Sequence, residues 1–570
     1  MFTTTRCQNG NPGLIHFGGG APLIRTICFL LALCVSGLLI AQQHEMPSPS
    51  QPATLMTGLG NLHHPVSTSN QQAQQFFDQG LRLIYAFNHD EAARSFQRAA
   101  ELDPNLAMAY WGIAEAIGPN YNDPASDERF QQAHNAIQKA VAVQAGASPA
   151  ERAYIAAMAV RFPADSKADR RKAAESYRDA MREVMRQYPD DPDAATLFAE
   201  AGMNLHPWGL WLPDGTPQDG TTDIVAALET VIRENPNHMG AVHYYIHAVE
   251  ASQSPERALA GANRLAALAP AAGHLVHMPA HVYIRTGDYE SAVLTNEKAA
   301  AADEAYIKAS GAHGIYPMMY YSHNLHFIAM CSAMNGNYPE AKKTADQLAN
   351  HVGPYVKDMP PLEAFVTVPM AVDVRFHRWN DIMQMKAPDP AMKTATTYYH
   401  FARGMALAAS GKTGQAEAEY VIVAEAEKTT PPDQIFAPPF NNTTKDVLKI
   451  ARDVLGAKIA LAKKDNASAI TLLRAAVSVE DSLKYAEPPA WFFPVRESLG
   501  AVLLTSGDAA EAEIVFRDDL QRHPRNPRSL FGLQQALKAQ KRDYDAQFVG
   551  TQFQTSWKGS QKQLTLEDLV

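Results

Sequence analysis

The sequence has few cysteines for its length, and their positions exclude a disulfide framework. Only four cysteines occur in 570 residues. Cys7, Cys28 and Cys34 lie in or before an apolar run near the N-terminus, which leaves Cys331 alone in the rest of the chain. Small disulfide-stabilised proteins need an even, spaced set of cysteines. This chain must therefore be held together by packing, and its 46% hydrophobic residues provide the apolar surface to do so.

Positive charge and several enzyme motifs are also lacking. The chain carries 50 Lys and Arg against 60 Asp and Glu, with no basic run that could follow a phosphate backbone, so nucleic acid is not expected as a partner. A Walker loop, a nucleophile elbow and a CxxCH haem attachment are absent. The segment "HYYIH" (243–247) has Tyr244 where the HExxH motif places its glutamate, which disfavours a zinc protease of that type.

One long apolar run is present, at residues 27–41, and it follows Arg6 and Arg25. The run is shorter than the roughly 20 residues that cross a membrane comfortably, but its length is normal for the core of a signal peptide. We interpret residues 1–41 as a signal peptide or an N-terminal anchor. The protein is expected to be exported, either periplasmic or secreted, with membrane contact only if this segment is retained.

Residues 42–70 are rich in Pro, Ser and Gln without a helical period, which indicates a linker ending in a helix cap at Ser69 or Asn70. Helix-forming residues dominate the chain beyond it. The prolines punctuate this part, and 34 positions separate Pro236 from Pro270. That interval is the period of tetratricopeptide repeats (TPR).

A recurring pattern of small and aromatic residues agrees with this period. In the segment that starts at residue 73, the pattern consists of Gly80, Ala92, Phe96, Ala99 and Pro104. In the segment that starts at residue 493, the same places hold Gly500, Ala512, Phe516 and Pro524. The pattern resembles the TPR consensus, in which small residues let two helices approach and the aromatic ring fills the space between them. The resemblance implies an all-α, TPR-type α-solenoid of antiparallel helix pairs with a concave groove.

The expected organisation follows from this repeat pattern. The ranges are 71–237 for N-terminal TPR-like repeats, 238–352 for central histidine-rich repeats, 353–545 for C-terminal TPR-like repeats and 546–570 for a polar C-terminal tail. The runs "HYYIHAVEAS", "AGHLVHMPAHVYIRTGDY" and "EPPAWFFPVRESLGA" further resemble a group of exported bacterial TPR proteins. No reaction is established for that group, so the resemblance implies a fold and a location and transfers no catalytic residues.

Histidines are concentrated in the central repeats. Nine of the 20 histidines lie between residues 238 and 326. Aligned on the repeat, three successive units begin at Met239, Gly273 and Ser322, and the resemblance implies that certain places on the first helix of each unit face the groove. The histidines at these places are His243, His247, His274, His277, His281, His323 and His326.

This spacing predicts a transition-metal site. Histidines at i and i+3 or i+4 on one helix can give two nitrogens to one ion, and imidazole ligands in an exported protein favour zinc or copper. Glu250, one turn after His247, is the candidate catalytic residue, as proton acceptor, carboxylate ligand or partner of an imidazole. Three alternatives remain open: a metalloenzyme built on the same site, a scaffold that binds an extended peptide or protein in the groove, and a purely structural histidine network.

Overall fold

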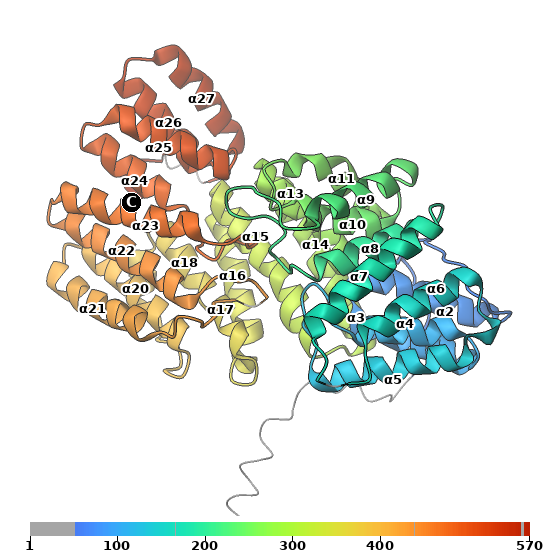
Figure 1. The fold of residues 1–570 in the computed structure, drawn as a ribbon. Helices are drawn as coiled ribbons and strands as arrows, with labels where there is room; N and C mark the ends of the chain where they lie inside the picture. Colours follow the sequence, from blue (N-terminus) through green and yellow to red (C-terminus); the bar gives the residue numbers. More distant parts are fainter. Residues whose placement is uncertain (1–51, 166, 438, 560–563) are drawn as a thin grey trace, which may run out of the picture. The chain divides into compact units, whose positions relative to one another are not determined.

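The computed structural model describes residues 52–165, 167–437, 439–559 and 564–570. Regular structure in these ranges is helical, with no β-strand among them. Consecutive helices pair, and each pair packs against the next one along the chain (Figure 1). The expected all-α, TPR-type solenoid of antiparallel helix pairs is therefore confirmed.

Helix pairs follow one another along most of the described chain between residues 71 and 556, with shorter helices between residues 353 and 392. Up to residue 352 they are α2 (Gln71–Ile84) with α3 (His89–Leu102), α4 (Ala107–Ile117) with α5 (Asp127–Val143), α6 (Pro149–Arg161) with α7 (Arg170–Gln187), α8 (Pro192–Met203) with α9 (Thr221–Glu234), α10 (Met239–Val249) with α11 (Leu259–Leu268), α12 (Gly273–His277) and α13 (Pro279–Thr286) with α14 (Tyr289–Ser310), and α15 (Ser322–Asn335) with α16 (Tyr338–Val352).

The C-terminal half continues the same arrangement. Its helices are α17 (Glu363–Val366), α18 (Val368–Arg375) and α19 (Trp379–Gln384), then α20 (Lys393–Ala409) with α21 (Thr413–Thr429), α22 (Thr444–Ala462) with α23 (Asn466–Ser482), α24 (Val495–Thr505) with α25 (Ala509–Arg522), and α26 (Pro527–Ala539) with α27 (Asp543–Ser556). Short 3₁₀ turns occupy Gln144–Gly146, Pro255–Ala258, Gly353–Tyr355, Pro360–Leu362 and Leu566–Leu569, and a π-helical turn occupies Tyr316–Tyr321.

Close helix contacts explain why the repeat pattern needs glycine. The Phe96 ring is fully buried, and a Cβ added to Gly80 would lie 2.6 Å from its Cε1. A Cβ on Gly112 of the next pair would meet the same ring. Phe516 is enclosed in the same way by Gly500 and by a glycine of α26. The phenylalanine therefore fills the space between the two helices of its pair, as the sequence pattern predicts, and it also packs against the first helix of the next pair.

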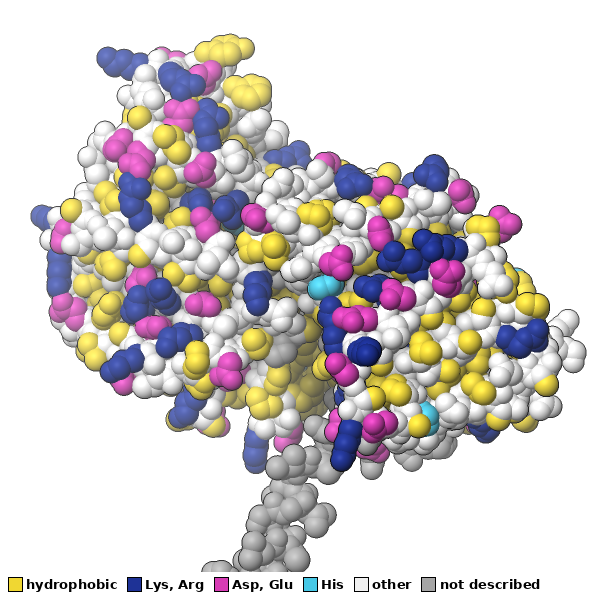
Figure 2. Space-filling view, viewed as in Figure 1, with side chains coloured by type: hydrophobic (Ala, Val, Ile, Leu, Met, Phe, Trp, Pro, Cys, Tyr) yellow, Lys and Arg dark blue, Asp and Glu magenta, His cyan; other side chains and the backbone are white. Residues whose placement is uncertain are grey.

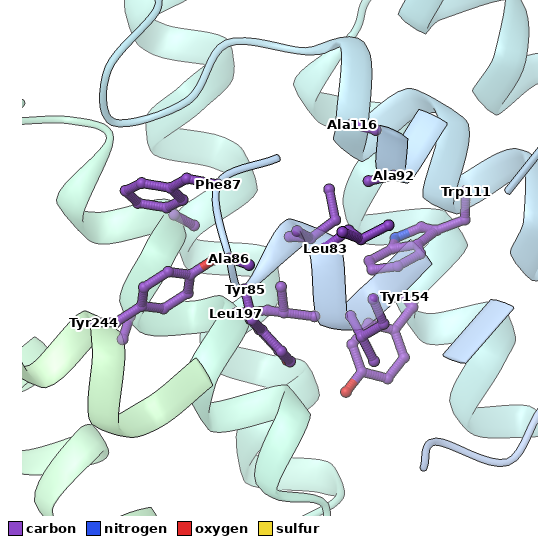
Figure 3. Packing of buried hydrophobic residues seen from close by; sticks show 14 of the residues in the cluster. Leu83, Tyr85, Ala86, Phe87, Ala92, Trp111, Ala116, Tyr154, Leu197 and Tyr244 are labelled. Carbon is purple, nitrogen blue, oxygen red and sulfur yellow. The ribbon is translucent and has the colours of Figure 1, made fainter. Parts of the chain in front are cut away.

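The N-terminal core joins helices that are far apart in the sequence. Figure 3 shows Tyr85 and Phe87, which follow α2, beside Tyr244 of α10. The ring centroid of Tyr244 lies 5.7 Å from that of Tyr85 and 5.8 Å from that of Phe87. This packing places the end of α2 against the histidine-bearing helix of the central repeats.

The segments predicted as a linker and a polar tail are both partly packed against the solenoid. Residues 52–69 contain no helix, yet Leu59 and Val66 are buried, and Asn70 caps α2 by accepting from the amides of Gln72 and Ala73. The range expected as a polar tail, 546–570, instead begins inside α27, because this helix packs on α26.

The apolar run at 27–41, interpreted as a signal peptide or anchor, lies outside the described residues. None of the helices that the structure describes is long and apolar enough to cross a membrane.

Candidate metal centre

The predicted histidines sit on the first helices of three consecutive repeats. His243 and His247 lie one turn apart on α10, His274 and His277 on α12, and His281 on α13. Pro279, which has no N–H to continue the helix, begins α13. The last two predicted ligands are His323 and His326 of α15.

These histidines are enclosed rather than exposed on an open wall. The five residues of α10, α12 and α13 are each at most 4% exposed, and the two of α15 are half-buried. On the face drawn in Figure 2, histidine side chains show only as small isolated spots. The sequence predicts that these histidines line a concave groove; the structure instead buries the five of α10, α12 and α13, because aromatic side chains from other segments cover them.

Six of the seven histidines gather into two groups of three. The first group is His243, His247 and His274, and the second is His277, His281 and His323. Within each group, one ring nitrogen of every member lies within 4.8 Å of those of the other two. The groups are neighbours, since the His247 and His281 ring centroids are 5.6 Å apart and those of His274 and His277 are 5.7 Å apart.

His326 is the predicted ligand that the structure leaves out. Its ring lies 6.3 Å from Phe492 in a stacked arrangement and 5.6 Å from Phe365 edge-on. Within the described part of the chain, it belongs to no group of possible metal ligands. Although residues three positions apart share a helix face, the His326 ring packs between Phe365 and Phe492, away from the ring nitrogens of the two groups.

Glu250 links the two groups through its carboxylate. Oε1 accepts a hydrogen bond of 2.7 Å from Nδ1 of His247, and Oε2 accepts one from Nδ1 of His281. The Tyr485 hydroxyl also donates to Oε2, at 3.1 Å. Both oxygens are therefore occupied as acceptors. A carboxylate that orients metal-binding imidazoles has this arrangement. A carboxylate that acts as a proton acceptor needs a free oxygen, which Glu250 does not have.

Two further Nδ1 atoms are fixed by acceptors that cannot donate. Nδ1 of His243 donates to the backbone carbonyl of Tyr85 at 2.7 Å, and Nδ1 of His277 donates to Oδ1 of Asn296 at 2.6 Å. The Asn296 amide nitrogen is itself committed to the carbonyl of Ala292. A neutral imidazole carries one ring proton, so Nε2 of each of these histidines has a free lone pair.

These lone pairs point into the cluster. Nε2 of His243 lies 3.1 Å from Nε2 of His274, and Nε2 of His277 lies 2.7 Å from Nε2 of His281. Nε2 of His247 is buried without any hydrogen-bond partner. An unpaired acceptor in a buried site costs roughly 1–3 kcal/mol, and two facing lone pairs repel. A cation or a shared proton removes this cost.

Burial keeps most of the cluster neutral. Burial and the neighbouring imidazoles hold the pKa well below its ordinary value in His243, His274, His277 and His323. His281 differs: burial opposes charge, but the Glu250 carboxylate raises the pKa of its imidazole. Burial likewise opposes ionisation of Glu250, but His281 and His247 hold its pKa below the usual range. Neutral imidazoles beside a carboxylate are the state in which histidines bind metal.

Aromatic side chains from distant segments enclose the cluster. Phe87 stacks on His247 with centroids 5.6 Å apart, and Trp208 meets the same imidazole edge-on at 5.5 Å. Both Phe87 and Trp208 have a positive φ, 53° and 55°, which is uncommon for residues other than glycine. Tyr121 and Tyr320 contact His247 and His274 respectively. Strained backbone beside a buried polar cluster is a common property of functional sites.

Sequence reasoning missed a second carboxylate at this site. Oε2 of Glu487 lies 3.5 Å from Nδ1 of His281, and Glu250, His281 and Glu487 form a further possible ligand group. Burial raises the pKa of the Glu487 carboxyl to about 8. Glu487 and Tyr485 belong to the segment "KYAEPPAWFF", in which a glutamate within an apolar and aromatic run was the available signal. Asn296 and Phe87 carried no comparable signal.

Comparisons with known proteins found no match in sequence and low-scoring matches among solved structures. No known family and no curated protein matches the sequence. Among solved structures, the human IFIT1 dimer with m7Gppp-AAAA is 12% identical with a TM-score of 0.30, covering 86% of this chain and 91% of that one. Yeast Tom70 is 10% identical with a TM-score of 0.25, covering 85% and 93%. The APC/C Cut9–Hcn1 hetero-tetramer is 11% identical with a TM-score of 0.31, covering 90% and 82%. Scores this low carry no inference about function.

Proposed function

We propose that this protein binds a transition-metal ion, zinc or copper, in the buried histidine cluster. The first group, His243, His247 and His274, provides three imidazole nitrogens from two adjacent helices. The observation that carries the proposal is the Nε2 atom of His247, which is buried without a partner while Nδ1 of the same ring is held by Glu250. A metal ion is the partner that a neutral, oriented imidazole in this state can bind.

The geometry of the first group supports the same conclusion. Zinc–imidazole bonds measure about 2.0–2.1 Å, so two ligands in a tetrahedral site lie roughly 3.4 Å apart. The Nε2 atoms of His243 and His274 are separated by 3.1 Å. Three protein ligands would leave a fourth position for water or a substrate, which is the arrangement of catalytic zinc sites. The export that we also propose rests on the apolar run at 27–41 alone.

In this proposal Glu250 orients imidazoles and does not act as the proton acceptor. Its two oxygens already accept from His247, His281 and Tyr485. A carboxylate that holds a metal-bound imidazole fixes the tautomer and makes the nitrogen a better ligand. The alternative of an extended peptide bound at these histidines has less support, because the five histidines of α10, α12 and α13 are covered.

The test is the metal content of the full chain, purified without a polyhistidine tag, measured by inductively coupled plasma mass spectrometry. The protein is expected to retain zinc or copper, and His247→Ala to lose an ion. His326→Ala is the matched control, because this imidazole lies in the same region but stacks on Phe492. Protein without bound metal, or equal content in the protein and in His247→Ala, would refute the proposal. Circular dichroism verifies that each variant is folded.

A further inference from the structure

We infer that the cluster holds two metal ions, with a second ion at His277, His281 and His323; this inference rests on the proposed function. The second group reproduces the geometry of the first. It has three imidazoles from successive first helices, with ring nitrogens within 4.8 Å of one another. In both groups, two of the Nδ1 atoms donate to fixed acceptors, so that in the neutral state Nε2 of each of these rings keeps its lone pair.

The contact between His277 and His281 requires a proton or a metal ion between the two Nε2 atoms. Nδ1 of His277 donates to Asn296, and Nδ1 of His281 donates to Glu250. Their Nε2 atoms face each other at 2.7 Å, so in the neutral state two lone pairs would be in contact. An ion bound to both would hold the nitrogens roughly 3.4 Å apart, which requires a ring movement of less than about 1 Å.

The six imidazoles cannot act as equal ligands of one ion, because their ring nitrogens form two separate groups of three. His247 belongs to the first group and His281 to the second, with ring centroids 5.6 Å apart. Glu250 accepts from one imidazole of each group, through a different oxygen for each. One carboxylate therefore orients a ligand of both ions. This arrangement places the two ions side by side with a common outer partner.

Charge also favours a second cation at this end of the cluster. The carboxyl groups of Glu250 and Glu487 both lie next to His281 and are buried. A cation at His277, His281 and His323 would lie beside both groups, and a nearby positive charge stabilises a buried carboxylate. Among the ion pairs of the described residues, Glu487 pairs with His281 and with no histidine of the first group.

The stoichiometry of binding tests the inference. The full chain is stripped of metal with a chelator, desalted and titrated with Co²⁺, and the visible absorption of Co²⁺ bound by nitrogen ligands is followed. The end point is expected at two ions per chain. The variants His247→Ala and His323→Ala are each expected to bind one ion, and the double variant none. His326→Ala is expected to bind two, and mass spectrometry of zinc-loaded protein gives a second count.

The outcomes separate this inference from the proposal that it extends. One ion per chain in the unsubstituted protein, with normal binding in His323→Ala, overturns the second site and leaves the first. In that case a proton shared between His277 and His281 fills the place of the second ion. One ion that either His247→Ala or His323→Ala abolishes also overturns the inference, in favour of a single shared centre. No bound ion at all refutes both proposals.

Discussion

Replacing Glu250 by glutamine tests how the metal centre is oriented. The carboxylate has two acceptor oxygens, and His247 and His281 each donate to one of them. Glutamine has nearly the same shape but only one acceptor, since its second terminal atom is an NH₂ donor. After Glu250→Gln, one of the two imidazoles therefore faces a donor. That ring loses its fixed tautomer and orientation.

The magnitude follows from this count of acceptors. Loss of one outer partner of a metal-binding histidine weakens affinity by about 10–100-fold, equivalent to about 1.4–2.7 kcal/mol at 25 °C. We expect a loss in this range for one ion, measured by competition with a chromophoric chelator of known affinity. Backbone structure should persist because the substitution changes the volume very little, and circular dichroism checks this.

Tyr485→Phe is the matched control for this experiment. It removes the hydroxyl that donates to Oε2 of Glu250 at 3.1 Å, but leaves the carboxylate and both imidazole bonds intact. We expect metal affinity to fall by less than about tenfold, because a single hydrogen bond contributes only about 0.5–1.5 kcal/mol to stability. Unchanged metal affinity in Glu250→Gln, or a larger loss in Tyr485→Phe, would refute the reasoning about Glu250.

Two further predictions concern stability. Burial lowers the pKa of His64, but its 2.8 Å hydrogen bond to Asp193 and the charge of that residue raise it to about 9. The stabilisation that protonated His64 provides is thus complete below the unfolded pKa of about 6.5 and is lost as the pH rises through 9. At about 1.4 kcal/mol per pKa unit, His64→Gln should lower the free energy of unfolding in guanidinium by up to about 3 kcal/mol at pH 6 and by little at pH 10. The same loss at both pH values, or a comparable loss in the exposed control His313→Gln, would contradict this. Phe96→Ala should cost about 3–5 kcal/mol in the same assay because the ring fills the space beside Gly80; a loss below 1 kcal/mol would contradict that packing role.

The sequence predicted the fold because repeat packing is local. Gly80, Ala92 and Phe96 recur at fixed spacing, and each helix pair needs only its neighbours to bury its apolar face. The convergence of the histidines was predictable for the same reason: His243 and His247 share one face of α10, and the next unit places His277 and His281 at equivalent positions. The structure brings these residues together.

The rest of the site depends on contacts that no local pattern records. Tyr485 reaches Glu250 across 235 positions of the chain. Phe87 and Trp208 cover the imidazoles from two loops, so the histidines predicted to line a concave groove form an interior cluster. His326 shares the register of the ligands but packs against Phe365 and Phe492, and repeat alignment alone does not reveal that contact.

The bond from Tyr485 to Glu250 also limits how this solenoid could change during evolution. Repeat arrays usually gain and lose units freely, since each unit touches only its neighbours. Here, adding or removing a helix pair between α11 and α23 would carry Tyr485 and Glu487 away from the imidazoles. Duplications are therefore expected to be tolerated outside this interval, for example beyond α24, and selected against within it.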